Sequence, residues 1–462
     1  MDSNAHYMTV RELYEGAADK SLKEGTLVDI DGWVYGNRSS SNVGFLSFND
    51  GTCFRNVQVV YEKSLKDYEA ISKFRLGASV SIVGSIHLTP EAMQPVEIHL
   101  TEAALVGDVA DGYPIQKKRT SYEFLRTIPH LRVRTNTFRA VFRVRSVLSM
   151  AIHEFFQGEG FVYVHTPIIT SDDAEGAGQT FKVITDISHP DDYFGVPVSL
   201  TVSGQLHVEP FAMAFRDVYT FGPTFRAEKS NTTHHAAEFW MIEPEIAYAD
   251  LYDDIDLIED FLKYIVKYVM ANCPDEISFF DKWVSKGLKQ RLDDFVNKPF
   301  TQVDYTDAIN ILLKAKADGH KFNNDNIYWG LDLESEHERY LTEQVFKGPI
   351  FLTNYPKEIK AFYMKQNPDG KTVAAVDLLV PQIGELVGGS EREWDYDKLL
   401  NRMKELHMNI EAYQWYLDLR RYGSVPHAGF GLGFERMMQF VTGMENIRDV
   451  ECYPRTYKEC KF

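Results

Sequence analysis

The stretch GFGLGFERMMQF, residues 429–440, decides how the rest of the chain is interpreted. Its three glycines lead into a charged pair, Glu435 and Arg436, and an apolar run with helical spacing follows. Glycine lets the backbone approach a ligand because it has no Cβ that would clash. Taken alone, such a pattern usually reflects packing. Placed with other motifs, an arginine at the first turn of an apolar helix indicates an anionic ligand.

Length and composition narrow the class of protein. A chain of 462 residues exceeds what one core usually organises, so we expect at least two domains. No apolar run reaches the roughly eighteen residues of a membrane span, and the N-terminus resembles neither a secretory leader nor a transit peptide, so we expect a cytoplasmic protein. The cysteines lack C-x-x-C spacing, which argues against a disulfide framework or a zinc site. They are Cys53, Cys273, Cys452 and Cys460.

The net charge of -18 argues against general coating of nucleic acid, because binding to phosphates depends on clustered Lys and Arg. One basic stretch, KKRTSYEFLRTIPHLRVR at residues 117–134, could still form a local patch for RNA. A solvated linker is the alternative interpretation of that stretch. Its basic residues are Lys117, Lys118, Arg119, Arg126, Arg132 and Arg134.

Residues 26–104 are predicted to form several short strands, since apolar positions alternate and turn residues such as Asn49-Asp50-Gly51 separate the runs. A small barrel of the OB-fold type fits this pattern, and such barrels commonly bind oligonucleotides.

Helical spacing replaces alternation from Val141 to Phe155. Strands are expected in 161–170, 196–204, 218–228 and 238–249, helices are expected to dominate 251–370 and 395–420, and strands resume at 373–387. The fold class predicted here is α+β with a mostly antiparallel sheet flanked by helices, because no regular strand and helix alternation is present. No P-loop or dinucleotide fingerprint occurs, so any nucleotide is bound in another way.

Three separated stretches matter together: GFVYVHTPIIT (160–170), TFRAEKSNTTHHAAEFWMIEPE (224–245) and GFGLGFERMMQF. In this order they resemble the three motifs of the class II aminoacyl-tRNA synthetases. The asparaginyl branch is most similar, through SGQL, TFRAE, EFWMIEPE, GGSERE, DLRRYG and RDVECYPRT. The resemblance covers nearly the whole chain. It implies an OB-fold anticodon-binding domain at 1–106, a basic hinge at 107–135 and a catalytic domain at 136–462, with motifs at about 141–170, 218–246 and 427–442.

The resemblance implies a ligase that activates asparagine with ATP and transfers it to tRNA(Asn). Because a carboxylate attacks the α-phosphate, catalysis depends on positioning and on neutralising charge. The catalytic residues implied are Arg226, Glu228 and Arg436. ATP would be held by these three together with His234, His235, Phe239, Glu385 and Gly433. Mg²⁺ would be carried by Asp377 and Glu385, since that ion prefers one or two carboxylates.

Substrate choice follows from one missing cation. Related aspartyl enzymes carry a lysine two positions after their Q-L pair, and here that position is Val208. A carboxylate at Glu243 without that lysine would repel aspartate but accept hydrogens from a carboxamide, and Arg392 could donate to the amide oxygen. The resemblance implies that the α-ammonium is held by Glu175, Ser203 and Gln205.

The barrel would bind the anticodon through Arg38, Phe45 and Gln58, unless Phe45 belongs to the barrel core. Pro167 would lie at the contact between the subunits of a homodimer. Other interpretations remain open: an aspartyl-tRNA ligase, an asparagine-forming relative that acts without tRNA, and a non-catalytic tRNA-binding relative.

Overall fold

The computed structural model describes residues 5–118, 120–172, 179–189, 193–230 and 232–462. The chain divides into two compact units, Met1–Ala140 and Val141–Phe462. The catalytic part was predicted to begin at residue 136, which is where the long helix α5 starts. No helix in the described ranges has both the length and the apolarity needed to cross a membrane.

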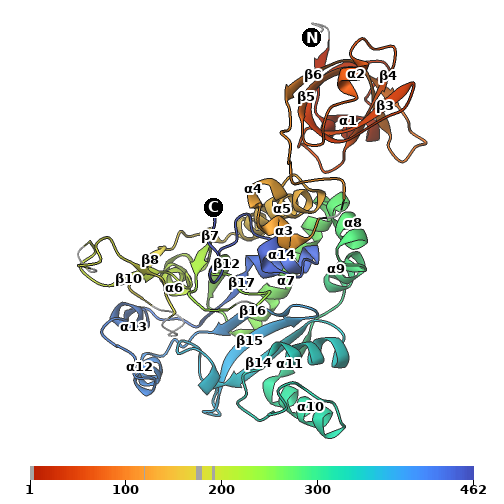
Figure 1. Ribbon diagram of the computed structural model, residues 1–462. Helices are drawn as coiled ribbons and strands as arrows, with labels where there is room; N and C mark the ends of the chain where they lie inside the picture. Colours follow the sequence, from red (N-terminus) through yellow and green to blue (C-terminus); the bar gives the residue numbers. More distant parts are fainter. Residues whose placement is uncertain (1–4, 119, 173–178, 190–192, 231) are drawn as a thin grey trace. The chain divides into compact units, whose positions relative to one another are not determined.

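The first unit is a closed barrel, as predicted (Figure 1). Its strands follow the order β1-β2-β3-β4-β6-β5, and pairing of β2 with β5 closes the sheet on itself. Alternate side chains point inward and form the barrel core, which includes Val28, Leu46 and Ile98. The elements are β1 (His6–Tyr7), α1 (Val10–Ala18), β2 (Leu27–Ser39), β3 (Val43–Asn49), β4 (Val57–Glu62), α2 (Tyr68–Ile71), β5 (Ser79–Leu88) and β6 (Val96–Gly107).

The basic stretch after the barrel forms two short helices, α3 (Tyr122–Arg126) and α4 (Pro129–Arg132). Arg132 is fully buried, with its guanidinium 4.3 Å from the centre of the Phe138 ring. It therefore cannot belong to a surface patch, and this part of the prediction was wrong. Lys117, Lys118 and Arg134 are exposed, whereas Arg119 lies outside the described residues.

The second unit is built around an eight-stranded sheet of order β13-β14-β15-β16-β17-β12-β11-β7. Neighbouring strands are antiparallel except in the pairs β13–β14 and β11–β7, so the predicted α+β class with a mostly antiparallel sheet is confirmed. A smaller sheet of order β8-β10-β9 accompanies it. The strands are β7 (Val162–Tyr163), β8 (Ile169–Thr170), β9 (Lys182–Val183), β10 (Val198–Leu200), β11 (Asp217–Phe225), β12 (Glu238–Ala247), β13 (Thr301–Asp304), β14 (Ile350–Pro356), β15 (Thr372–Val380), β16 (Gly384–Glu391) and β17 (His427–Gly433).

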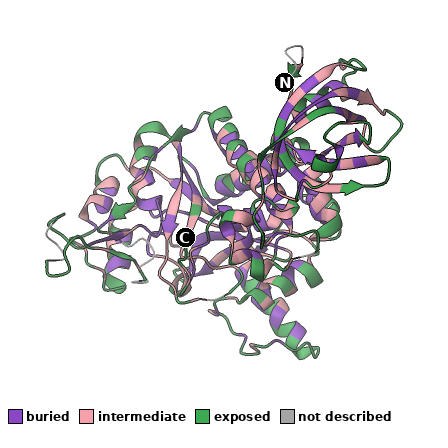
Figure 2. Ribbon diagram, turned by 45° about the horizontal axis from the view of Figure 1, so that its top comes forward, coloured by how far each residue is buried: buried purple, intermediate pink, exposed green. Residues whose placement is uncertain are grey.

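Helices cover the sheet, and buried residues concentrate in the interior (Figure 2). Strand β15, an inner strand of the sheet, is buried along its whole length. Aromatic rings join helix and sheet: Phe156 stacks on Tyr219 with ring centres 4.6 Å apart and lies 4.7 Å from Phe261. The helices are α5 (Asn136–Gly158), α6 (Gln205–Phe215), α7 (Leu251–Asn272), α8 (Pro274–Trp283), α9 (Leu288–Asn297), α10 (Tyr305–Ala317), α11 (Ser335–Arg339), η1 (Tyr340–Val345), η2 (Lys357–Ile359), α12 (Tyr396–Glu405), α13 (Gln414–Arg421), α14 (Phe434–Thr442) and η3 (Ile447–Asp449).

Two strands, β13 and β14, lie where helices were expected to dominate. Both are short, and β14 is an almost continuously buried run without alternation. Periodicity alone does not separate such a run from a helix segment. The strands form because they pair with each other and β14 pairs with β15, contacts that are distant in sequence.

Gly44 offers a test of barrel packing. A Cβ on Gly44 would overlap the buried ring of Tyr61, whereas a Cβ on Gly36, on the neighbouring strand, would lie 3.6 Å from Ser47 Cβ. We predict that Gly44→Ala destabilises the barrel by about 1–3 kcal/mol, since overpacking forces neighbouring groups to move. Hydrogen exchange of the barrel amides measures this, with Gly36→Ala as the control. Equal exchange in the two variants would contradict the packing described here.

Candidate active site

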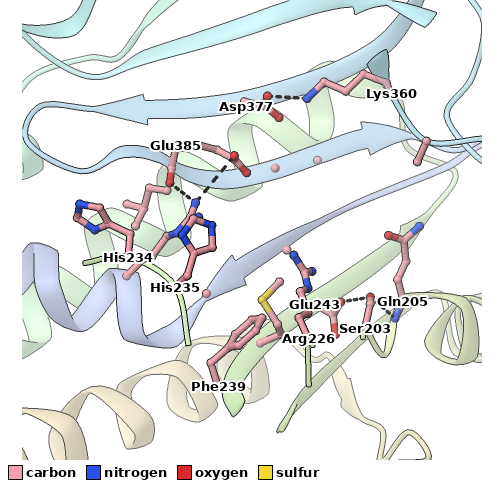
Figure 3. Close-up of a pocket in the computed structure, with 18 of the residues that line it drawn as sticks. Ser203, Gln205, Arg226, His234, His235, Phe239, Glu243, Lys360, Asp377 and Glu385 are labelled. Carbon is pink, nitrogen blue, oxygen red and sulfur yellow. Dashed lines mark hydrogen bonds and ion pairs between the residues drawn. The ribbon is translucent and has the colours of Figure 1, made fainter. Parts of the chain in front are cut away.

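A cavity of about 480 Å³ opens over strands β12, β15, β16 and β17 of the second unit (Figure 3). It brings together residues from separate segments of the chain, within 203–243, 332–392 and 431–447. The predicted site residues that line it are Ser203, Gln205, Arg226, Glu228, His234, His235, Phe239, Glu243, Asp377, Glu385, Arg392, Gly433 and Arg436. Glu175 lies outside the described residues.

The two charged residues at the start of α14, Glu435 and Arg436, make different contacts. Glu435 is buried, pairs with Arg145 on α5 at 2.6 Å and accepts a hydrogen bond from the Trp240 N–H at 2.9 Å. Arg436 lines the cavity, and its Nη1 donates to the Glu385 carbonyl oxygen at 2.8 Å. Glu435 therefore fixes the start of the helix, and this leaves Arg436 directed at the cavity.

The glycines before α14 have different functions. Gly431 and Gly433 line the cavity, as a close backbone approach to a ligand requires. A Cβ on Gly429 would instead overlap the Pro244 carbonyl oxygen and the Glu245 side chain. Gly429 is thus needed for close pairing of β17 with β12, so the expectation that all three glycines face a ligand was wrong.

Arg226, which follows the last residue of β11, lies next to Phe239 of β12. The guanidinium of Arg226 lies 5.4 Å from the centre of the Phe239 ring, which offers an aromatic face beside a cation. The segment between the two strands carries Glu228 and His235, whose Oε2 and Nε2 atoms are 3.9 Å apart. Burial and the nearby Arg436 lower the pKa of His235. The pKa of His234 is also lowered, mainly by burial.

Ser203, Gln205 and Glu243 gather at another part of the cavity, apart from His234 and Glu385 (Figure 3). The Ser203 hydroxyl and the Gly204 N–H, at 2.8 Å, both donate to the Glu243 carboxylate. These two donors hold a buried acceptor in a fixed orientation. Such a group is suited to bind a ligand that carries N–H donors.

Arg392 forms its ion pair with Glu245 rather than with Glu243. Its Nη2 lies 2.5 Å from Glu245 Oε1, and both side chains are buried. Sequence reasoning missed Glu245, although the pattern contained the signal. Residues 243 and 245 alternate onto the same face of β12, so both carboxylates had to be considered.

Acidic side chains dominate the region around Asp377. A Cβ on Gly388 would lie 3.3 Å from Glu385 Oε1 and 3.4 Å from Asp377 Oδ1. The two carboxylates therefore approach each other over Gly388 of β16, where no side chain separates them. Glu338, which sequence reasoning missed, lies beside them and is half-buried. Burial raises the pKa of Glu338 to about 8, and Glu385 and Asp377 add to this effect. These carboxylates fit a hard divalent cation.

Lys360 is a further residue that no sequence pattern indicated. Its Nζ pairs with Asp377 Oδ2 at 2.6 Å and lies 3.9 Å from the centre of the Tyr355 ring. Burial alone would lower the pKa of Lys360, but the carboxylates of Asp377 and Glu385 raise it. The lysine therefore already neutralises part of the acidic region.

In the first unit, Arg38, Phe45 and Gln58 lie on three adjacent strands. Arg38 is opposite Phe45 in the register of β2 and β3, and its guanidinium is 5.2 Å from the ring centre. Phe45 lies outside the barrel core, which contains its neighbour Leu46. Gln58 donates to Glu97 at 2.8 Å. The three side chains therefore share a face with an aromatic surface.

Comparison with known proteins gives a consistent result. The model of tRNA synthetases class II (D, K and N) matches residues 121–457, and that of the OB-fold nucleic acid binding domain matches residues 28–106. The chain belongs to the class II tRNA synthetases. The synthetase is 54% identical to the asparagine–tRNA ligase of Clostridium beijerinckii, covering 98% of both chains. It is 55% identical to that of Acetivibrio thermocellus, covering 98% of this chain and 99% of the relative.

A solved structure supports the same relationship. The asparaginyl-tRNA synthetase from Pyrococcus horikoshii, complexed with asparaginyl-adenylate, is 36% identical to the synthetase, with a TM-score of 0.84 over 95% of this chain and 96% of that one. The predicted enzyme class, an aminoacyl-tRNA ligase, is thereby confirmed.

A buried carboxyl next to α14 predicts a pH dependence of stability. Burial raises the pKa of Glu451 from an ordinary 4.5 to about 9, and Glu435 adds to the shift. The unfolded chain releases this proton at lower pH than the folded chain does. The contribution of the bound proton to the stability of the fold is therefore complete below pH 4.5 and is lost as pH rises toward 9.

We therefore predict that Glu451→Gln becomes more stable than the unsubstituted protein as pH rises. The difference in the free energy of unfolding should grow by more than about 1 kcal/mol between pH 5 and pH 8. Denaturant unfolding at several pH values measures it. Glu445→Gln, at an exposed position, is the control. A difference that stays constant with pH would contradict the assignment.

Proposed function

We propose that the chain is an asparagine–tRNA ligase, which forms asparaginyl-adenylate from asparagine and ATP and transfers the asparaginyl group to the 3′ end of tRNA(Asn). Relatives of that name are 54–55% identical over nearly the whole length. The observation that carries the proposal is the pair of buried groups, Glu243 and Arg392, that line one cavity. Protein synthesis in the cytoplasm is the context this function implies.

Glu243 and Arg392 differ in what they offer to a ligand. Ionised Glu243 can only accept hydrogen bonds, so it suits the NH₂ of a carboxamide and repels a carboxylate. Arg392 uses three of its five N–H groups on Glu245 and Ser390, which leaves two without an acceptor in the described part of the chain. Those two N–H groups suit the carboxamide oxygen. Asparagine satisfies both residues, whereas aspartate leaves one buried group unpaired.

Lys360 does not replace the lysine of the aspartyl enzymes. Its ammonium is paired with Asp377. Glu243 is oriented instead by Ser203 and Gly204. This separation supports asparagine as the substrate, because the cation that aspartate would need is committed to another carboxylate.

Activation needs the substrate carboxylate and the α-phosphate to be held in line. Arg226 would bridge these two groups, while Phe239 and Arg436 would hold the adenine between an aromatic ring and a guanidinium. Glu228, His234 and His235 would contact the remainder of the nucleotide, with Gly433 allowing its close approach. Mg²⁺ held by Asp377 and Glu385 would neutralise charge on the phosphates. Ser203 and Gln205, together with Glu175, would bind the α-ammonium.

RNA and a second subunit complete the proposed enzyme. The face that carries Arg38, Phe45 and Gln58 would stack and read anticodon bases. Pro167 would lie at the contact of a homodimer. It is exposed between β7 and β8, where Val162, Ile168 and Ile169 are also exposed. An exposed apolar segment of this kind suits a subunit contact.

Amino-acid-dependent exchange of pyrophosphate into ATP tests the proposed substrate. Asparagine should support exchange, and aspartate should be at least 100-fold weaker in kcat/KM because it leaves buried groups unpaired. Glu243→Gln should lose most of the preference for asparagine. Exchange driven by aspartate alone would make the chain an aspartyl enzyme, and no exchange with either would favour a non-catalytic relative.

Arg436→Ala tests the nucleotide site. We predict a loss of exchange of at least about 100-fold, since a charge-stabilising donor is removed, with tRNA binding largely retained. Arg421→Ala, on the exposed surface of α13 and outside the cavity, is the matched control. Unchanged exchange in Arg436→Ala would contradict the role assigned to this arginine.

A further inference from the structure

Four buried side chains surround the carboxylate of Glu209, on α6: one lies a turn earlier on the same helix and three come from residues 416–427. Gln205 Nε2 donates to its Oε1 at 3.2 Å, and the Tyr416 hydroxyl lies 2.7 Å from the same atom. Arg420 Nη2 and His427 Nε2 lie 3.1 and 3.0 Å from its Oε2. Glu209 itself is fully buried. None of the motif assignments uses this carboxylate.

The cluster is not a cation site, although ligand atoms of Glu209, Glu245 and His427 lie within 4.8 Å of one another. Arg420 already neutralises Glu209, and Arg392 neutralises Glu245. His427 directs its other ring nitrogen, Nδ1, at the Val425 carbonyl oxygen, 2.9 Å away. The negative charges thus have their partners within the protein, and a metal ion would bring two guanidinium groups into repulsion.

The chemical consequence concerns Gln205. A glutamine amide donates at Nε2 and accepts at Oε1, so its orientation decides which group it presents to a ligand. Ionised Glu209 only accepts, so it forces Nε2 to face the protein. Gln205 lines the cavity, and no donor in the described ranges reaches its Oε1. The free end of the amide is therefore an acceptor.

An α-ammonium group carries three N–H donors and no acceptor, so it requires this orientation of the amide. The donors around Glu209 also keep the carboxylate ionised: burial would raise its pKa, but Arg420 and His427 lower it well below the ordinary value. These contacts join α6, which carries Gln205, to α13 and to the first residue of β17.

We infer that Glu209 is a positioning residue: it holds the Gln205 amide with its oxygen toward the cavity, so that the oxygen accepts a hydrogen bond from the α-ammonium of the substrate. The inference rests on the proposed function, because it takes asparagine as the ligand. A glutamine at 209 could donate as well as accept, and the Gln205 amide would then no longer be held in one orientation.

The test compares binding of L-asparagine with binding of succinamic acid, which is asparagine without its α-ammonium. Calorimetric titration of the full chain gives both dissociation constants. Glu209→Gln should weaken asparagine about 10-fold or more, while the constant for succinamic acid should change less than about twofold. At saturating asparagine, kcat for pyrophosphate exchange should stay within about threefold, since KM carries the loss.

Tyr416→Phe is the matched control. It removes one donor from the same carboxylate but leaves the charge of Glu209 and its contact with Gln205, so stability should fall while the ratio of the two dissociation constants stays constant. If Glu209→Gln does not fold, Glu209→Asp serves instead. It keeps the charge that Arg420 and His427 require and withdraws it from Gln205, and it should weaken asparagine selectively.

Equal weakening of asparagine and succinamic acid in Glu209→Gln or Glu209→Asp would show a general structural role and overturn the inference. Unchanged binding of both ligands would overturn it as well. Failure of the unsubstituted protein to bind asparagine would instead contradict the proposed function, so the two failures are distinguishable.

Discussion

The buried ion pair between Arg392 and Glu245 is the interaction on which the site depends. It joins the residue that follows β16 to β12, the two strands that flank β17 in the sheet, and the two side chains are only 2% and 0% exposed. Charges buried this deeply require partners in good geometry, since an isolated charge costs several kcal/mol. Glu245 provides that partner, so the guanidinium of Arg392 can lie beside the cavity with two N–H groups available to a ligand. Gly429, which permits the close approach of β17, belongs to the same arrangement.

Two groups of polar side chains, suited to different ligands, lie in different parts of the cavity. One part holds Glu243, Ser203, Gln205 and Arg392, where each polar group is oriented by a protein neighbour. Another holds Asp377 and Glu385, which pair with Lys360 and Arg436, beside Glu338, whose pKa is raised to about 8 by burial and by the two neighbouring carboxylates. A neutral carboxamide suits the first environment and a magnesium–phosphate complex suits the second. The same sheet can therefore bind a small amino acid in one part of the cavity and a large polyanion in another.

The sequence predicted the barrel and the fold class from its periodicity, and many of the cavity-lining residues from the resemblance of local motifs such as FRAE and GFGLGFER to those of the family. Other features depend on contacts between distant segments. Strands β13 and β14 are short runs that only their pairing makes extended. Lys360 and Glu338 come from segments without a recognisable pattern, and burial of Arg132 against Phe138 could not be read from a basic stretch. Glu245 could have been predicted from the sequence, since strand alternation places it on the same face of β12 as Glu243.

The contacts of the substrate carboxamide are tested most directly by a crystal structure with asparagine and a non-hydrolysable ATP analogue. The quantities to measure are the distances from the carboxamide nitrogen to the Glu243 carboxylate and from the carboxamide oxygen to the Arg392 guanidinium. We predict that both are hydrogen-bond distances of about 3 Å, with Arg392 still paired to Glu245. A carboxamide directed away from both side chains, or held by a lysine, would contradict it.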